Sequence, residues 1–171
     1  GAQTEETRRH LIAAGAHAGR VAVTGNIKFD AVNQPDWSPA RARSPAMLCA
    51  LIDSARPVIV SGCVTNLDEQ QMVLDAFVTV RERHPDTLLV LAPRHPEVRE
   101  RMQTLQQYLD QRDLPSVFRS SMADVPIATQ TACLVLDTMG ELRDFYAAAS
   151  VAHVGVDHNV LEPLAFGKPV T

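Results

Sequence analysis

The 171-residue sequence is poor in aromatic side chains, which make up 5% of it, and it contains only three cysteines. Cys49, Cys63 and Cys133 are far apart and stand among apolar neighbours. An odd number of cysteines without metal-ligand spacing is typical of buried reduced thiols, and argues against a disulfide framework or a zinc site. We therefore expect a cytosolic protein.

Long apolar runs and an excess of positive charge are also lacking. No apolar stretch approaches the ~20 residues that cross a bilayer, and the opening GAQTEETRRH does not have the pattern of a signal peptide. The net charge of -4 excludes the basic surface with which nucleic-acid-binding domains neutralise phosphates. We expect no nucleic-acid partner, and we expect the chain to be an excised piece of a longer protein.

From residue 57 onwards, short β-branched runs alternate with segments of helical periodicity. The expected strands are residues 57–62, 87–92, 132–137 and 151–155, and the expected helices are residues 67–83, 97–112 and 140–149. Helix 67–83 places Met72, Val73, Ala76, Phe77 and Val80 on one face. Continuously apolar strands separated by helices indicate a parallel sheet covered on both faces. The predicted fold class is α/β, a doubly wound parallel sheet of the Rossmann-like type.

The first part of the chain has a different pattern. Residues 4–14 are predicted to be a helix and residues 20–26 (RVAVTGN) a strand. Residues 31–43 are polar, contain two prolines and the only tryptophan, and are predicted to be a linker. Residues 45–54 are expected to form a short helix that docks onto the first strand.

Three polar loops follow expected strands, at the edge where parallel sheets bind ligands. Arg94 and His95 stand between two prolines after the second strand. The segment TMGEL follows the third expected strand, and VDHNVLEP follows the fourth, before a short apolar helix that ends at Gly167. Loops that share this edge are expected to converge on one crevice.

Each loop also permits a structural interpretation. The spacing from Thr138 to Glu141 and from Asn159 to Glu162 is that of a capping box, which satisfies the amides of a helix and binds nothing else. Arg94 and His95 are equally compatible with a solvated loop. These alternatives remain open on spacing alone.

Two kinds of site are excluded. Gly62 in SGCVTN is not followed by the Gly-Lys-Ser/Thr of a phosphate-binding loop, which argues against nucleotide hydrolysis. His10, His17 and His84 have no partners at metal-ligand spacing. We expect no metal site.

Four motifs in this order, VTGNIKFD, LVLAPRHPE, LDTMGEL and HNVLEPLAFGKPV, resemble those of the 3-deoxy-D-manno-octulosonic acid (Kdo) transferases. These are two-domain glycosyltransferases of the GT-B type, which transfer Kdo with inversion from CMP-Kdo to lipid A precursor in lipopolysaccharide biosynthesis. They work at the cytoplasmic face of the bacterial inner membrane. The resemblance implies that residues 1–44 are the end of the amino-terminal domain and the interdomain crossover, and that residues 45–171 are a truncated donor-binding domain.

The resemblance also implies a set of residues that bind CMP-Kdo. By position in the motifs they are Pro93, Arg94, Pro96, Met139, Gly140, Glu141, His158, Asn159 and Glu162. A carboxylate such as Glu162 can accept two hydrogen bonds from a ribose diol, and Arg94 can donate to a phosphate. We expect no cofactor and no metal, because a cation can stabilise the phosphate of the leaving CMP.

The family's general base is expected in the amino-terminal domain, so no catalytic residue is assigned to this fragment and we expect it not to turn over alone. Binding of the lipid A precursor and attachment to the membrane are likewise expected only through parts outside this chain.

Two departures from the family pattern leave other functions open. Asn66 follows Thr65 where the family tends to have histidine, and residues 155–158 are shorter than the family's glycine-rich loop, so we expect disorder around Asp157. The alternatives are an enzyme similar to UDP-N-acetylglucosamine 2-epimerase, also of the GT-B type, and a nucleotide-binding module without catalysis.

Overall fold

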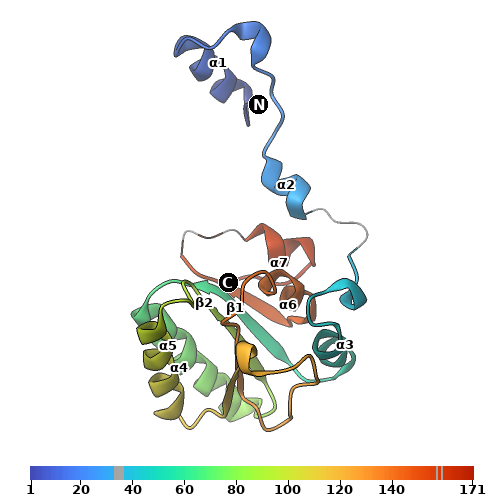
Figure 1. Ribbon diagram of the computed structural model, residues 1–171, viewed down its shortest axis with the longest axis vertical. Coiled ribbons are helices and arrows are strands. Elements are labelled where there is room, and N and C mark those ends of the chain that lie inside the picture. Colours follow the sequence, from blue (N-terminus) through green and yellow to red (C-terminus); the bar gives the residue numbers. More distant parts are fainter. Residues whose placement is uncertain (33–36, 157, 159) are drawn as a thin grey trace. The chain divides into compact units, whose positions relative to one another are not determined.

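The computed structural model describes residues 1–32, 37–156, 158 and 160–171 (Figure 1). The chain divides by its internal contacts into two units, Gly1–Asp36 and Trp37–Thr171. The disorder expected around Asp157 concerns residues outside the described ones, and so does the predicted role of Asn159.

Over its described residues, the first unit contains two α-helices, α1 (Glu5–Ala13) and α2 (Ile27–Val32), with the 3-10 turn Ala18–Arg20 between them. The Thr4 side chain caps α1 by accepting a hydrogen bond from the Thr7 amide, as the predicted helix start requires. The strand predicted at residues 20–26 is wrong. A strand needs a partner along its length, and among the described residues this segment makes only an isolated bridge between Ala2 and Val23.

A five-stranded sheet forms the centre of the second unit, with the strand order β3-β4-β2-β1-β5 and every pair parallel. The strands are β1 (Val58–Val64), β2 (Leu88–Pro93), β3 (Ser116–Phe118), β4 (Cys133–Val135) and β5 (Val151–Val154). All six residues of the central strand β2 are buried, because helices cover both of its faces. The predicted doubly wound α/β fold is confirmed.

Five α-helices lie among the described residues of this unit, and they form two layers (Figure 1). They are α3 (Pro45–Asp53), α4 (Leu67–Arg83), α5 (Arg99–Asp110), α6 (Leu142–Ala148) and α7 (Leu161–Ala165). Helices α3 and α6 contribute Met47, Leu48 and Phe145 to one hydrophobic cluster. Helices α4 and α5 contribute Leu74 and Leu105 to the other, so each face of the sheet has its own core.

The buried face of α4 differs from the predicted one. Val73 and Phe77 are buried as expected, but Leu74 is also fully buried and Met72 is 59% exposed. Leu74 shares its cluster with Leu105 of α5, because α4 packs against its neighbouring helix as well as against the sheet. The buried stripe is therefore rotated away from Met72.

The second half of the predicted linker packs against the sheet unit. The ring of Trp37 lies 4.8 Å from that of Phe166 in an edge-to-face arrangement, and its Nε1 donates to Asp144 at 2.9 Å. Pro39–Arg41 then forms a single 3-10 turn that leads to α3. The polar composition of this segment did not indicate that the Trp37 ring would pack against the sheet unit.

Gly62 lies where β1 meets α6, and no larger residue fits there. A Cβ atom on Gly62 would lie 2.0 Å from Tyr146 Oη and 3.0 Å from a methyl group of Leu142. We expect Gly62→Ala to destabilise the fold by about 1–3 kcal/mol through overpacking. Removal of the hydroxyl in Tyr146→Phe should recover part of this loss.

Chemical denaturation of the two single variants and the double variant measures this coupling. If Gly62→Ala costs the same stability with Tyr146 as with Phe at position 146, the result would contradict the assigned contact between residues 62 and 146.

Candidate functional site

A cleft of about 520 Å³ lies at the carboxyl ends of β1, β2 and β4. Six of the predicted site residues line it, namely Pro93, Arg94, Pro96, Met139, Gly140 and His158. The structure thus brings together residues from three loops that are up to 65 positions apart in the sequence, from 93 to 158. Asn159 is not described, and Glu141 and Glu162 are not among the described residues that line the cleft.

Arg94 and His158 are joined by a hydrogen bond across the cleft. Arg94 Nη1 lies 2.8 Å from His158 Nε2, and a guanidinium can only donate, so this ring nitrogen accepts. Thr65 Oγ1 lies 3.3 Å from the same nitrogen, and the amide of Arg94 donates to the Val64 carbonyl at 2.8 Å. Arg94 itself is exposed. Its cation is oriented by neighbours and still has further N–H groups for a ligand.

Two non-glycine residues that line the cleft have left-handed backbones. The φ angle of Cys63 is 58° and that of His95 is 59°. Such values are uncommon outside glycine and cluster at functional sites. Cys63 lies in an irregularity of β1, where the register with β2 shifts between Ser61 and Val64, near the end of β1 that borders the cleft.

Glu141 is buried behind the cleft and holds the turn that lines it. Its carboxylate accepts hydrogen bonds from the hydroxyls of Ser44 and Thr138 and from Arg119 Nε at 3.1 Å. Burial alone would raise the pKa of Glu141, but these hydrogen bonds and the charge of Arg119 outweigh it and lower the pKa. The capping box suggested by Thr138 and Glu141 does not form, because the threonine donates to the carboxylate and caps no amide.

Glu162 is half-buried on α7, the helix that follows the loop of His158. Burial raises its pKa, although Arg143 acts in the opposite direction. Its charge also contributes to raising the pKa of Cys63, after burial of that thiol, and Cys63 lines the cleft. Helix α7 has Val160 as its N-cap residue, so Glu162 is at the second helical position and does not complete a capping box.

The pH dependence of stability separates a binding role of Glu162 from a structural one. Because its pKa in the fold is raised, stability is lost as pH rises from the unfolded pKa through the folded one. We expect Glu162→Gln to raise the melting temperature at pH 7.5, and the gain to vanish at about pH 3, where the carboxyl is protonated in both states.

Thermal unfolding at the two pH values, with exposed Glu100→Gln as the matched control, measures the effect. A lower melting temperature of Glu162→Gln at pH 7.5 would instead assign the carboxylate to fold stability.

Sequence reasoning missed Glu69, which is 7% exposed on the first turn of α4. Its carboxylate accepts from the amide of Thr65 at 2.5 Å and from that of Val156 at 3.1 Å. Asn66 caps α4 by accepting from the Glu69 amide at 2.8 Å. The spacing from Asn66 to Glu69 was a visible signal of a helix start, but not of a link to the loop after β5.

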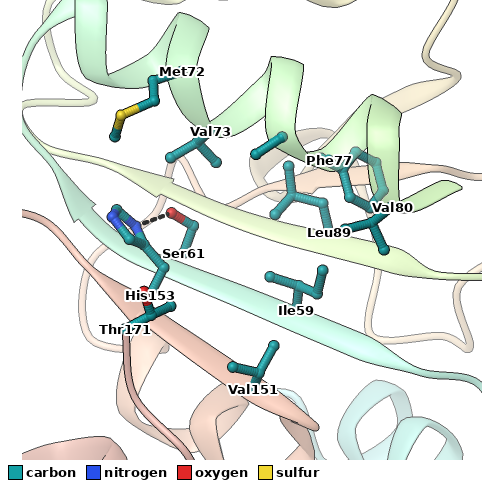
Figure 2. Close-up of a pocket in the computed structure, with 11 residues that line it drawn as sticks. Ile59, Ser61, Met72, Val73, Phe77, Val80, Leu89, Val151, His153 and Thr171 are labelled. Carbon is teal, nitrogen blue, oxygen red and sulfur yellow. Dashed lines mark hydrogen bonds between the residues drawn. The ribbon is translucent and has the colours of Figure 1, made fainter.

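A second hollow lies on the α4 face of the sheet, over β1 and β5. Figure 2 shows it lined mainly by apolar side chains of α4, of these two strands and of β2, with Ser61 and His153 joined by the only drawn hydrogen bond. Ser61 Oγ and His153 Nδ1 are 2.7 Å apart, so these two polar groups pair with each other. This groove of about 310 Å³ offers far fewer polar groups than the cleft, which is the better candidate for a charged ligand.

Two features are absent from the residues that the structure describes. Among them, no group of three or more His, Cys, Asp or Glu side chains could hold a metal ion. Over the same residues, no helix has the length and apolar character needed to span a bilayer.

Comparison with known proteins gives consistent results for sequence and structure. No family model matches the chain. It is 32% identical over 154 residues to the 3-deoxy-D-manno-octulosonic acid transferase of Haemophilus influenzae, a match that covers 86% of this chain and 34% of that protein. It is 33% identical over 179 residues to the enzyme of the same name from Bordetella pertussis, with 99% of this chain and 39% of that protein covered.

A solved structure is also similar. It is the C-terminal CMP-Kdo binding domain of WaaA from Acinetobacter baumannii, with a TM-score of 0.58 and 27% sequence identity, covering 67% of this chain and 60% of that one. The chain thus spans less than half of the length of the curated relatives named above.

Proposed function

The chain is a relative of the 3-deoxy-D-manno-octulosonic acid (Kdo) transferases, and on this premise we propose that it is the donor-binding part of such a glycosyltransferase. The proposed binding site for CMP-Kdo is the cleft at the carboxyl ends of β1, β2 and β4. The observation that carries the proposal is the convergence of Arg94, Met139 and His158 on this one cleft. The similar domain of WaaA is named for the same ligand.

The cleft has the groups that a cytidine monophosphate needs. Arg94 supplies a cation for the phosphate, oriented by its hydrogen bond to His158. The apolar side chains of Pro93 and Met139 flank the cleft and suit the face of a pyrimidine ring. Glu162 of α7 is proposed to accept hydrogen bonds from the ribose hydroxyls.

The proposed role of Glu141 differs from that of the other eight predicted donor-binding residues. Its carboxylate is engaged by Ser44, Thr138 and Arg119, so it contributes by holding the turn of Met139 and Gly140. Arg43 supports the same turn by donating to the Met139 carbonyl. Gly140 is required there because its φ angle is 84°.

The chemistry of the whole enzyme is proposed from the family. Charge that develops on the phosphate as CMP departs would be stabilised by Arg94 without a metal. The general base and the site for lipid A precursor are proposed to lie in an amino-terminal domain outside this chain, at the inner membrane. The fragment alone is then expected to bind the donor and not to transfer the sugar.

Calorimetric titration of the folded chain with CMP and with UDP tests the proposal. We expect heat of binding with CMP, weaker or no binding with UDP, and loss of the CMP signal in Glu162→Ala. Tighter binding of UDP would favour an enzyme similar to UDP-N-acetylglucosamine 2-epimerase. No heat with either nucleotide would contradict the proposed donor site.

A further inference from the structure

The carboxylate of Glu69 connects two loops that follow different strands. One oxygen accepts from the amide of Thr65, in the loop after β1, and the other accepts from the amide of Val156, in the loop after β5. Hydrogen bonds from amides to a buried carboxylate are among the stronger ones in proteins. Glu69 is therefore a clamp between the β1–α4 loop and the β5–α7 loop.

The backbones of the two loops are in close contact at this clamp. The Gly155 amide donates to the Gly62 carbonyl at 2.9 Å. A Cβ atom on Gly155 would lie 2.2 Å from the Cys63 carbonyl oxygen and 3.2 Å from Glu69 Oε1. Only glycine permits this approach, so the position of one loop depends on that of the other.

Both loops held by Glu69 contribute to the environment of Arg94. The β1–α4 loop carries Thr65, and the β5–α7 loop carries His158; the two side chains are 3.3 Å apart. His158 in turn accepts from Arg94. A shift of either loop would change the position of the hydrogen-bond acceptor that orients the Arg94 cation.

We propose that Glu69 is a positioning residue for the phosphate of the bound nucleotide, acting through Thr65 and His158 on Arg94. This inference rests on the proposed function of the cleft. The carboxylate itself is buried and is held by two amides, so it touches no ligand. Glu69 affects the part of the cleft that is proposed to bind the phosphate. The part around Met139, which is proposed to bind the pyrimidine, does not depend on Glu69.

The test compares CMP with cytidine, which lacks the phosphate, as ligands of the folded 171-residue chain. In Glu69→Gln one carboxylate oxygen becomes an amide NH2 group, a donor that faces a backbone N–H donor, so one arm of the clamp is lost. We expect the Kd for CMP to rise about tenfold, because Arg94 is no longer held in place and must be ordered when the phosphate binds, and the Kd for cytidine to stay unchanged. The amide resonances of Thr65 and Val156 should shift in the same variant.

Asp68→Asn is the matched control, because Asp68 is exposed on the same turn of α4 and loses the same charge. It should leave both Kd values unchanged. Titrations far below the melting temperature ensure that a loss of stability alone does not alter Kd.

Equal CMP affinity of Glu69→Gln and the unchanged chain would overturn the positioning role and leave the proposed function intact. Equal losses for CMP and cytidine would overturn it as well, because they indicate a general disturbance of the cleft. If the unchanged chain binds neither ligand, the proposed function and this inference both fail. Should Glu69→Gln not fold, Glu69→Asp, which keeps the charge and is shorter by one methylene, is measured against the same outcomes.

Discussion

Glu141→Ala is expected to destabilise the sheet unit by about 3 kcal/mol, because it leaves the buried guanidinium of Arg119 without its carboxylate partner. The side chains of Arg119 and Glu141 are 12% and 6% exposed, so water cannot replace the lost partner. The hydroxyls of Ser44 and Thr138 lose their acceptor at the same time. Urea denaturation, with Glu82→Ala on the exposed surface of α4 as the control, measures the loss.

The pH dependence of this loss provides a second check. The pKa of Glu141 is lowered in the fold, so its contribution to stability is present above the unfolded pKa and is lost as pH falls through the folded one. The difference in unfolding free energy between the unchanged chain and Glu141→Gln should therefore become smaller as the pH falls. A constant difference from neutral to acid pH would show that its charge is not what stabilises the fold.

Arg94→Gln is expected to weaken CMP binding by about tenfold to a hundredfold, since charge-assisted hydrogen bonds contribute about 1.5–3 kcal/mol. Arg94 is exposed, so the substitution should leave the fold stability nearly unchanged. The loss should be smaller for cytidine, because the cation is assigned to the phosphate. Calorimetry of the two ligands with the variant measures both effects.

The matched control for Arg94 is Arg99→Gln, which removes the same charge from the exposed start of α5. It should weaken CMP binding only slightly, through long-range attraction that salt screens. Equal losses for Arg94→Gln and Arg99→Gln would assign binding to the overall charge of this surface and would contradict a specific contact in the cleft.

Much of the fold could be predicted from the sequence because its central strands are apolar without interruption. Residues 87–92 were predicted as a strand, and β2 occupies Leu88–Pro93 with every side chain buried. Helix α4 has the predicted bounds Leu67–Arg83, but its buried face was misjudged because contact with α5 is not encoded in its own periodicity. The strand predicted at residues 20–26 failed for a related reason, since pairing depends on a partner elsewhere in the chain.

The candidate site was predictable at the level of loops and less so at the level of side chains. The carboxyl ends of parallel strands lie at one edge, so the convergence of Arg94, Met139 and His158 follows from the fold. The buried position of Glu141 depends on Ser44 and Arg119, which are distant in sequence. Glu69 was missed because its spacing from Asn66 is that of a helix cap, and only the structure places Val156 against its second oxygen.

The most direct test of the donor-binding cleft is a titration of the isotope-labelled chain with CMP, followed by the amide resonances. The account predicts the largest chemical-shift changes for the amides of Arg94, Met139 and Gly140. The amide resonances of Ser61 and His153, in the apolar groove of Figure 2, should not change. Shifts concentrated at Ser61 and His153, or no shifts at saturating CMP, would contradict it.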